Sequence, residues 1–285
     1  MKKVTLALVI LFCLGLTNAG FAQVMEEDSE SGQWNSFYEE VHKGAFKAFD
    51  FPPVREADIV LSTRIWRTID FREKQNQIFY YPLVPTQGRV SLYYVLDKAA
   101  LDGLIRVYED DDCTKEIDWA KVKASLGTTK TITTYVYDSI DEMDKEVNQE
   151  ITNSIKADDV IRLRVKEDWF IDKQRSVRDV RIISFALVLS QEGGKGDLPL
   201  FYVHYDDPEV RQLLANTQVF NPKNDAQRLS YDDLFTKRLF SSYIIQQSDT
   251  QARNIQSYLT GEDQLLESDR IENELFEMDE DMWEY

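Results

Sequence analysis

The chain has 285 residues, of which 43% are hydrophobic and 12% aromatic, and its formal net charge at pH 7 is -18. This composition is typical of a folded globular protein and excludes a chain that is disordered throughout. The acidic excess argues against nucleic-acid binding and against adsorption to anionic lipid, because both depend on clustered lysine and arginine side chains.

Residues 1–22 have the features of a secretory signal peptide. Two lysines precede the apolar run 4–16, which is shorter than the roughly 20 residues that span a bilayer. Small residues end the segment and predict cleavage between Ala22 and Gln23. Lipoprotein processing at Cys13 is not expected, since bulky residues precede it. We therefore expect an exported mature chain with no direct membrane anchor.

Cys113 is the one cysteine that this cleavage leaves, so the mature chain is expected to form no internal disulfide. It lies in the segment EDDDCTKE. Neighbouring carboxylates are expected to raise the pKa of the thiol and to reduce its nucleophilicity, because the thiolate is the reactive form. The sequence therefore predicts an inert loop thiol.

Residues 23–54 predict an acidic and aromatic N-terminal arm that is flexible until it docks on another surface. We interpret residues 55–76 as one helix or two short helices, with Trp66 and Ile69 facing inward. The aromatic and β-branched content of residues 78–84 predicts a strand.

Apolar residues at helical spacing predict a helix from Ser91 to Ala100, with Gly103 as its C-cap. A short strand is expected at 104–109, which together with the strand before the helix gives a local β-α-β order. A helix at 118–127 and a strand at 131–139 follow, the latter from its threonine, valine and tyrosine content.

The clearest strand signal is the pair of segments 160–172 and 177–190. Charged and apolar residues alternate along the first of them, which is the period expected of a sheet with one wet face. A turn at 173–176 would join the two strands. We expect residues 55–285 to form a single α+β domain, in which helices pack on a mixed or antiparallel sheet with a long hairpin around residues 160–190.

The C-terminal third is expected to be helical. After a strand at 200–205, Asp207-Pro208 is typical of a helix start. Ser230 and Asp233 have capping-box spacing and predict a helix over 231–245. The last helix predicted is amphipathic, and its opposite face is nearly all carboxylate. Its apolar stripe consists of Ile271, Leu275, Met278 and Met282.

The sequence contains no pattern typical of catalysis, cofactor binding or metal binding. Its two histidines, His42 and His204, have no metal-ligand spacing, and the segment GGKGD lacks the residues of a phosphate-binding loop. We therefore expect no enzyme activity, no cofactor and no metal. A secreted hydrolase or glycan-binding protein stays open as the alternative, using clustered carboxylates and exposed aromatics such as Trp34 and Trp169.

The segment EDWFIDKQRSVRDVR at 167–181 concentrates cations beside aromatic residues. Residues 161–181 carry seven basic and four acidic side chains, in a chain that is otherwise strongly acidic. One interpretation is local ion pairing; the other is a docking surface, since aromatic and arginine residues are enriched in interface cores. In a homo-oligomer, the acidic C-terminal segment of one copy could lie on the hairpin of the next, a heterologous contact that generates rings. The candidate interface residues are Trp169, Phe170, Lys173, Arg175, Arg178 and Trp283.

Four segments of the chain resemble the GldN family of gliding motility and type IX secretion proteins of Bacteroidetes, called PorN in non-gliding relatives. The resemblance is ordered and covers most of residues 55–285. The segments are READIVLSTRIWRTIDFREKQNQIFYYP (55–82), KEDWFIDKQRSVRDVRIISFA (166–186), FNPKNDAQRLSYDDLFTKRLFSSYI (220–244) and LLESDRIENELFEMDEDMWEY (265–285).

This resemblance implies a non-catalytic, periplasmic subunit of the secretion and motility machinery. Members of the family form a ring with an outer-membrane lipoprotein, GldK or PorK, and the periplasmic part of the motor protein, GldM or PorM, reaches that ring. The resemblance thus implies self-association, attachment to the outer membrane through a lipoprotein partner, and no cofactor. It assigns no site to individual residues.

Overall fold

A computed structural model gives the fold of residues 47–281, apart from 87–88, 127, 139–142, 154, 191–196, 220, 222–223, 225–228 and 252. Within these limits, the side chains of 128–153, 190 and 278–281 are also left undescribed. The expected signal peptide with its cleavage site at Ala22 and Gln23, and the candidate interface residue Trp283, therefore lie outside the described residues.

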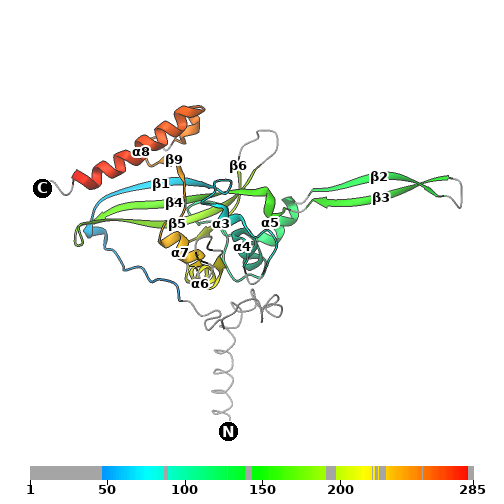
Figure 1. The fold of residues 1–285 in the computed structure, drawn as a ribbon, viewed down its shortest axis with the longest axis horizontal. Coiled ribbons are helices and arrows are strands. Elements are labelled where there is room, and N and C mark those ends of the chain that lie inside the picture. Colours follow the sequence, from blue (N-terminus) through cyan, green and yellow to red (C-terminus); the bar gives the residue numbers. More distant parts are fainter. Residues whose placement is uncertain are drawn as a thin grey trace, which may run out of the picture.

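A five-stranded antiparallel sheet, in the order β6-β5-β4-β1-β9, forms the centre of the molecule (Figure 1). Helices pack on this sheet, so the α+β prediction is confirmed. The strands are β1 (Ile59–Asp70), β4 (Val160–Asp172), β5 (Val177–Ser190), β6 (Asp197–His204) and β9 (Tyr243–Gln247).

Strands β4 and β5 form the long hairpin that the sequence predicts, joined by a turn at 173–176. At the start of β4, the alternation of apolar and charged residues produces the expected alternation of buried and partly buried side chains. Leu163 and Val165 are fully buried in the main hydrophobic core, whereas Arg162 and Arg164 are only partly buried. The first part of β4 therefore presents one apolar face to the main core.

The helix predicted over 55–76 is wrong, because strand β1 occupies most of this segment. Trp66 and Ile69 do not face the same way: Ile69 lies opposite Leu163 in the main core, and Trp66 lies opposite Lys166. Strand β1 has neighbours on both sides and is buried along its second half. Because side chains on both faces of this part of β1 are buried, apolar residues do not alternate strictly with polar ones, and their spacing resembles that of a helix.

Two further strand predictions are wrong. Residues 78–84 begin in the one-turn helix α3 (Gln77–Tyr80) rather than a strand, and the aromatic Phe79 is used in the core, where it stacks with Phe71 at 5.9 Å. At 104–109, Tyr108 makes isolated bridges to Tyr202 and Glu116, and no strand forms there. Aromatic content favours a strand only weakly, and here the buried Phe79 packs into the core from a helical turn.

Four helices begin or end as the sequence indicates. Ser91 caps α4 (Leu92–Leu101), and Gly103 follows this helix with a φ of 69°, the left-handed conformation that glycine adopts readily. Asp207 caps α6 (Pro208–Asn216). The predicted capping box at Ser230 begins α7 (Tyr231–Thr236), and α5 (Trp119–Leu126) matches the helix predicted at 118–127.

The C-terminal third is less helical than predicted. Helix α7 ends at Thr236 instead of continuing to residue 245, because Arg238 takes a left-handed φ of 51° and turns the chain toward β9. The short strands β7 (Gln218–Val219) and β8 (Leu229–Ser230) pair with each other. The final helix α8 (Glu262–Asp281) is present, with Ile271 and Leu275 of the predicted stripe buried.

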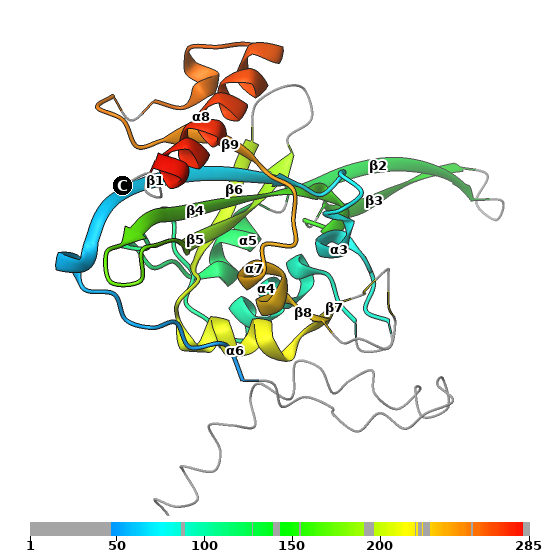
Figure 2. The same ribbon diagram turned by 60° about the vertical axis from the view of Figure 1, so that its left-hand side comes forward.

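Strands β2 (Thr128–Asp138) and β3 (Met143–Asn153) form a separate two-stranded antiparallel ribbon. It projects from the body at the end opposite the β4–β5 turn (Figure 1). Strand β2 confirms the strand predicted at 131–139, whereas β3 was not predicted. Figure 2 shows the same projection after a rotation, with α8 beside β1 and β9 on the body.

Candidate interface at the β4–β5 hairpin

Trp169 on β4 is buried, with a side chain only 7% exposed, although the sequence analysis treats it as an exposed aromatic. Three guanidinium groups lie over its ring, at 5.1 Å for Arg67, 5.1 Å for Arg178 and 5.5 Å for Arg238. Its indole nitrogen donates a hydrogen bond to Glu167 at 2.9 Å. The aromatic ring is therefore enclosed by cations of its own chain, an arrangement stabilised by its quadrupole.

Glu167 is fully buried and pairs with two of the three cations around Trp169, Arg67 and Arg238. Arg238 donates two hydrogen bonds to its carboxylate, at 2.9 and 3.1 Å, and Arg67 lies 3.4 Å from it. Burial lowers the pKa of Arg67, and the negative charge of Glu167 opposes that effect. Because a buried charge is costly unless it is paired, Glu167 stabilises the buried guanidinium of Arg67, while Arg238 is partly exposed.

Helix α8 covers the other side of this cluster. Ile271 and Leu275 pack against Ile65 on β1 and against Trp169. Arg178 on β5 donates a hydrogen bond to the carbonyl oxygen of Leu275 at 3.1 Å. The acidic C-terminal segment thus does contact the cationic hairpin, and in this structure the contact is made within one chain.

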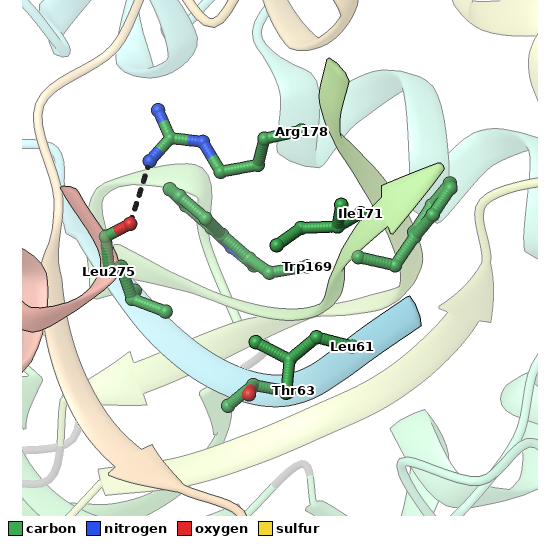
Figure 3. A pocket seen from close by; sticks show the side chains of 7 residues that line it. Leu61, Thr63, Trp169, Ile171, Arg178 and Leu275 are labelled. Atoms are coloured by element: carbon green, nitrogen blue, oxygen red, sulfur yellow. Dashed lines mark hydrogen bonds between the residues drawn. The ribbon is translucent and has the colours of Figure 1, made fainter. Parts of the chain in front are cut away.

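A shallow hollow lies where the hairpin, β1 and α8 meet (Figure 3). Figure 3 shows the Arg178 side chain crossing above Trp169 toward Leu275, with Leu61 and Thr63 below. The hollow has room for about one water molecule, which is too little for a substrate. The residues that line it are Leu61, Thr63, Trp169, Phe170, Ile171, Arg178 and Leu275.

The tip of the hairpin is polar and largely exposed. Arg175 forms hydrogen bonds with Asp172 at 2.7 Å and with Asp179 at 3.2 Å, which is the local pairing considered from the sequence. The hydrogen bond from Arg175, together with one from the backbone of Gln174, lowers the pKa of Asp172. Lys173 is exposed, and its backbone nitrogen donates to the carbonyl oxygen of Asp58 at 2.8 Å.

A family model described as gliding motility associated protein GldN matches residues 54–284. The chain belongs to the GldN family. A search of curated proteins finds no match. The match begins just before β1 and includes the hairpin, the Trp169 cluster and α8. The cluster therefore lies within the part of the chain that defines a family associated with gliding motility.

The candidate interface residues of this GldN chain divide into two groups. Trp169, Phe170 and Arg178 are engaged inside the molecule, the first two buried and the third against α8. Lys173 and Arg175 lie at the accessible hairpin tip. Whether any of them contacts a second molecule stays a prediction.

No pattern in the sequence predicts that Arg67, Glu167 and Arg238 belong to this cluster. Glu167 and Arg238 are 71 residues apart in the chain. No local pattern links residues so distant, because their pairing depends on the sheet register and on where α7 ends. The one local signal is an acidic pair, Glu167 and Asp168, placed directly before Trp169 within a predicted strand.

Within the described residues, the remaining acidic, histidine and cysteine side chains do not come together in a metal-binding or catalytic arrangement. Among the described residues, no group of three or more His, Cys, Asp or Glu side chains could hold a metal ion. Burial, followed by the charge of Asp110, raises the pKa of the Cys113 thiol to about 11, in agreement with the inert thiol predicted. In the part of the chain that the structure describes, no helix has the length and apolar character needed to cross a bilayer.

Proposed function

We propose that this GldN family protein is a non-catalytic structural subunit of the type IX secretion and gliding machinery. It forms a periplasmic ring with an outer-membrane lipoprotein of the GldK or PorK type, and the periplasmic part of a GldM- or PorM-like motor protein contacts that ring. The family match over residues 54–284 carries the proposal. The expected signal peptide supports export to the periplasm.

The geometry of the hairpin supports a structural role. The cations around Trp169 are balanced by Glu167 and by α8, so the cluster stabilises the fold. An active site would instead leave polar groups directed into a pocket large enough for a substrate. The hollow beside Trp169 has no such volume.

The surface near the hairpin tip supports self-association. Val60, Leu61, Val177 and Phe276 are each between 42% and 63% exposed. They belong to the start of β1, the start of β5 and the last turns of α8, elements that meet around the hollow. Exposed apolar side chains gathered on one part of a surface are typical of protein interaction sites.

The alternative of a glycan-binding protein or hydrolase receives no support from the described residues. Glycan binding would use Trp169 as an exposed stacking platform, and this side chain is buried under arginines and α8. Trp34 lies outside the described residues.

Affinity purification from the native cell envelope in mild detergent tests the proposed function. We expect an outer-membrane lipoprotein to co-purify in stoichiometric amount, as judged by quantitative mass spectrometry. An untagged strain carried through the same purification controls for adsorption to the resin. Recovery of the chain without a lipoprotein partner would refute the proposed role.

A further inference from the structure

We propose that the β2–β3 ribbon of one copy adds as a strand to the open edge of β1 in the next copy. This inference rests on the proposed function, because it names the contact that would join neighbouring subunits of the ring. The ribbon lies at one end of the body and the open edge of β1 at the other (Figure 1). A contact between them is head to tail, the kind of contact that closes into rings.

The ribbon is an element that lacks a partner within the described chain. Strands β2 and β3 have eleven residues each and, among the described strands, pair only with each other. At the rise of an antiparallel strand, the ribbon extends about 36 Å from its base. An isolated two-stranded ribbon is marginally stable in water and is stabilised by a further strand or a packed surface.

Of the two outer edges of the ribbon, β2 is the one suited to pairing. Nine of the eleven residues of TTKTITTYVYD are β-branched or aromatic, and Lys130 is the one charge before the final aspartate. Strand β3, MDKEVNQEITN, has charged residues at Asp144, Lys145, Glu146 and Glu150. Charged residues along an edge discourage pairing, whereas β-branched residues favour it.

Both outer strands of the five-stranded sheet are protected against additional pairing. Strand β6 contains Pro199, and its Tyr202 exchanges backbone hydrogen bonds of 2.8 and 2.9 Å with Tyr108. In β9, the backbone nitrogen of Ile244 donates to the Ser268 hydroxyl of α8 at 2.8 Å, and Gln246 bridges to Asn254. Neither edge therefore offers a free row of backbone groups.

The start of β1 lacks such protection. Strand β9 pairs with β1 only between Ile65 and Thr68, and the last bond on this side runs from the Ser248 nitrogen to the Arg64 carbonyl oxygen at 2.8 Å. Backbone groups alternate between the two sides of an antiparallel strand, so those of Ser62 point the same way as those of Arg64. In the described part of the chain no backbone group pairs with Ser62 on that side.

The side chains of this edge fit a pairing surface. Residues 59–63 read IVLST and contain no charge, proline or glycine. Val60 is 63% exposed, and a bulge in the pairing with β4 accompanies it. A second copy supplies a suitable occupant in β2, because strand addition needs only an extended segment with high β propensity.

The charges of the two surfaces are also compatible. Residues 128–153 contain six acidic and two basic side chains, a net charge of -4. Lys173 lies beside the start of β1, where its backbone nitrogen is bonded to Asp58, and its side chain is exposed. Among the described residues, Lys173 forms no salt bridge that would neutralise its charge. This cation is therefore positioned to meet an acidic ribbon.

Cysteine cross-linking in the native envelope tests the contact. In a Cys113→Ser background, Ser62→Cys is combined in turn with Thr131→Cys, Ile132→Cys, Thr133→Cys or Thr134→Cys, which spans the unknown register. We expect mild oxidation to convert more than half of at least one double variant into a ladder of dimers, trimers and higher multimers. A ladder arises because a head-to-tail contact links each copy to two neighbours.

Two controls are matched to this design. Ser62→Cys alone should give no multimers, because the contact is not symmetric; dimers from this variant would overturn the proposal. Ser62→Cys with Asn148→Cys on β3 should also give no ladder, since the charged edge of the ribbon faces away. A ladder of equal yield from the β3 pair would contradict the assignment of β2.

A shortened ribbon separates this inference from the proposed function. Thr128 and Asn153 are directly paired, so a two-residue Asn-Gly turn can replace residues 129–152. We expect this variant to keep its melting temperature and its lipoprotein partner but to form no rings. Rings that persist would overturn the ribbon contact while leaving the structural role intact. If the unmodified chain instead purifies without a lipoprotein, the proposed function is refuted, and this inference is refuted with it.

Discussion

Arg178 donates a hydrogen bond to the carbonyl oxygen of Leu275 at 3.1 Å and thereby joins strand β5 to helix α8. The same guanidinium lies 5.1 Å from the ring centroid of Trp169 and 4.9 Å from that of Phe276. Arg178 thus contacts both Trp169 on the neighbouring strand β4 and two residues of helix α8. The primary role of this cation is to hold the C-terminal helix on the body.

Replacing Arg178 with glutamine should loosen α8. The change removes two cation–π contacts and a charge-assisted hydrogen bond, and we expect the free energy of unfolding to fall by about 1–2 kcal/mol. Urea denaturation measures this loss, and hydrogen exchange should show faster exchange in α8. Arg270→Gln is the matched control, since Arg270 pairs with Glu267 on the exposed face of the same helix and should cost about 0.5 kcal/mol or less. Equal losses in the two variants would contradict the assigned role.

Deleting residues 270–285 should destabilise the protein without unfolding it. Ile271 and Leu275 are lost from a cluster that is separate from the main core, and burial of such side chains contributes about 2–5 kcal/mol each. We expect a lower melting temperature and a red shift of tryptophan fluorescence, because Trp169 becomes accessible to water. An unchanged melting temperature would show that the segment is a free acidic tail.

Glu167→Gln should be one of the most destabilising conservative changes in the chain. It removes the buried negative charge that pairs with the buried Arg67 and the partly exposed Arg238, and breaking a buried ion pair on one side costs about 3–5 kcal/mol. Glu272→Gln tests a partner of Arg67 that is partly exposed, and it should cost about 1 kcal/mol or less. Chemical denaturation of the two variants compares them directly. A small effect at Glu167 would mean that the cluster contributes little to stability.

Cys113 should react slowly with alkylating reagents at neutral pH. Burial raises the pKa of this thiol to about 11, above the ordinary value of about 8.5, so the reactive thiolate is scarce. The rate of iodoacetamide labelling should rise about tenfold for each pH unit between 8 and 10. Mass spectrometry measures this rate, with the urea-unfolded chain as the control. A rate that levels off below pH 9 would contradict the raised pKa.

The elements predicted correctly from sequence are those whose signals are local. The alternation along 160–172, the capping box at Ser230 and Asp233, and the aspartate-proline pair before α6 each lie within a few residues. Such signals depend on the spacing of apolar residues along the segment and on hydrogen bonds from side chains to nearby backbone groups. Such local signals can therefore be recognised without knowledge of the tertiary structure.

The segments predicted wrongly are those determined by distant partners. Strand β1 contains the buried Arg67, whose charge is balanced by Glu167 a hundred residues later, so its polar and apolar residues show no clean alternation. Strand β3 is too charged for its sequence to indicate a strand, and it forms by pairing with β2. The sequence draws attention to the cationic hairpin, but the packing of α8 against Trp169 depends on tertiary contacts that no local pattern indicates.

Negative-stain imaging of the tagged chain purified with its envelope partner tests the central claim most directly. Lipoprotein-containing rings of uniform diameter, absent from the untagged control, are the predicted result. Particles no larger than a single copy, from a preparation in which the chain is intact and folded, would contradict the claim that this GldN family protein is a structural ring subunit.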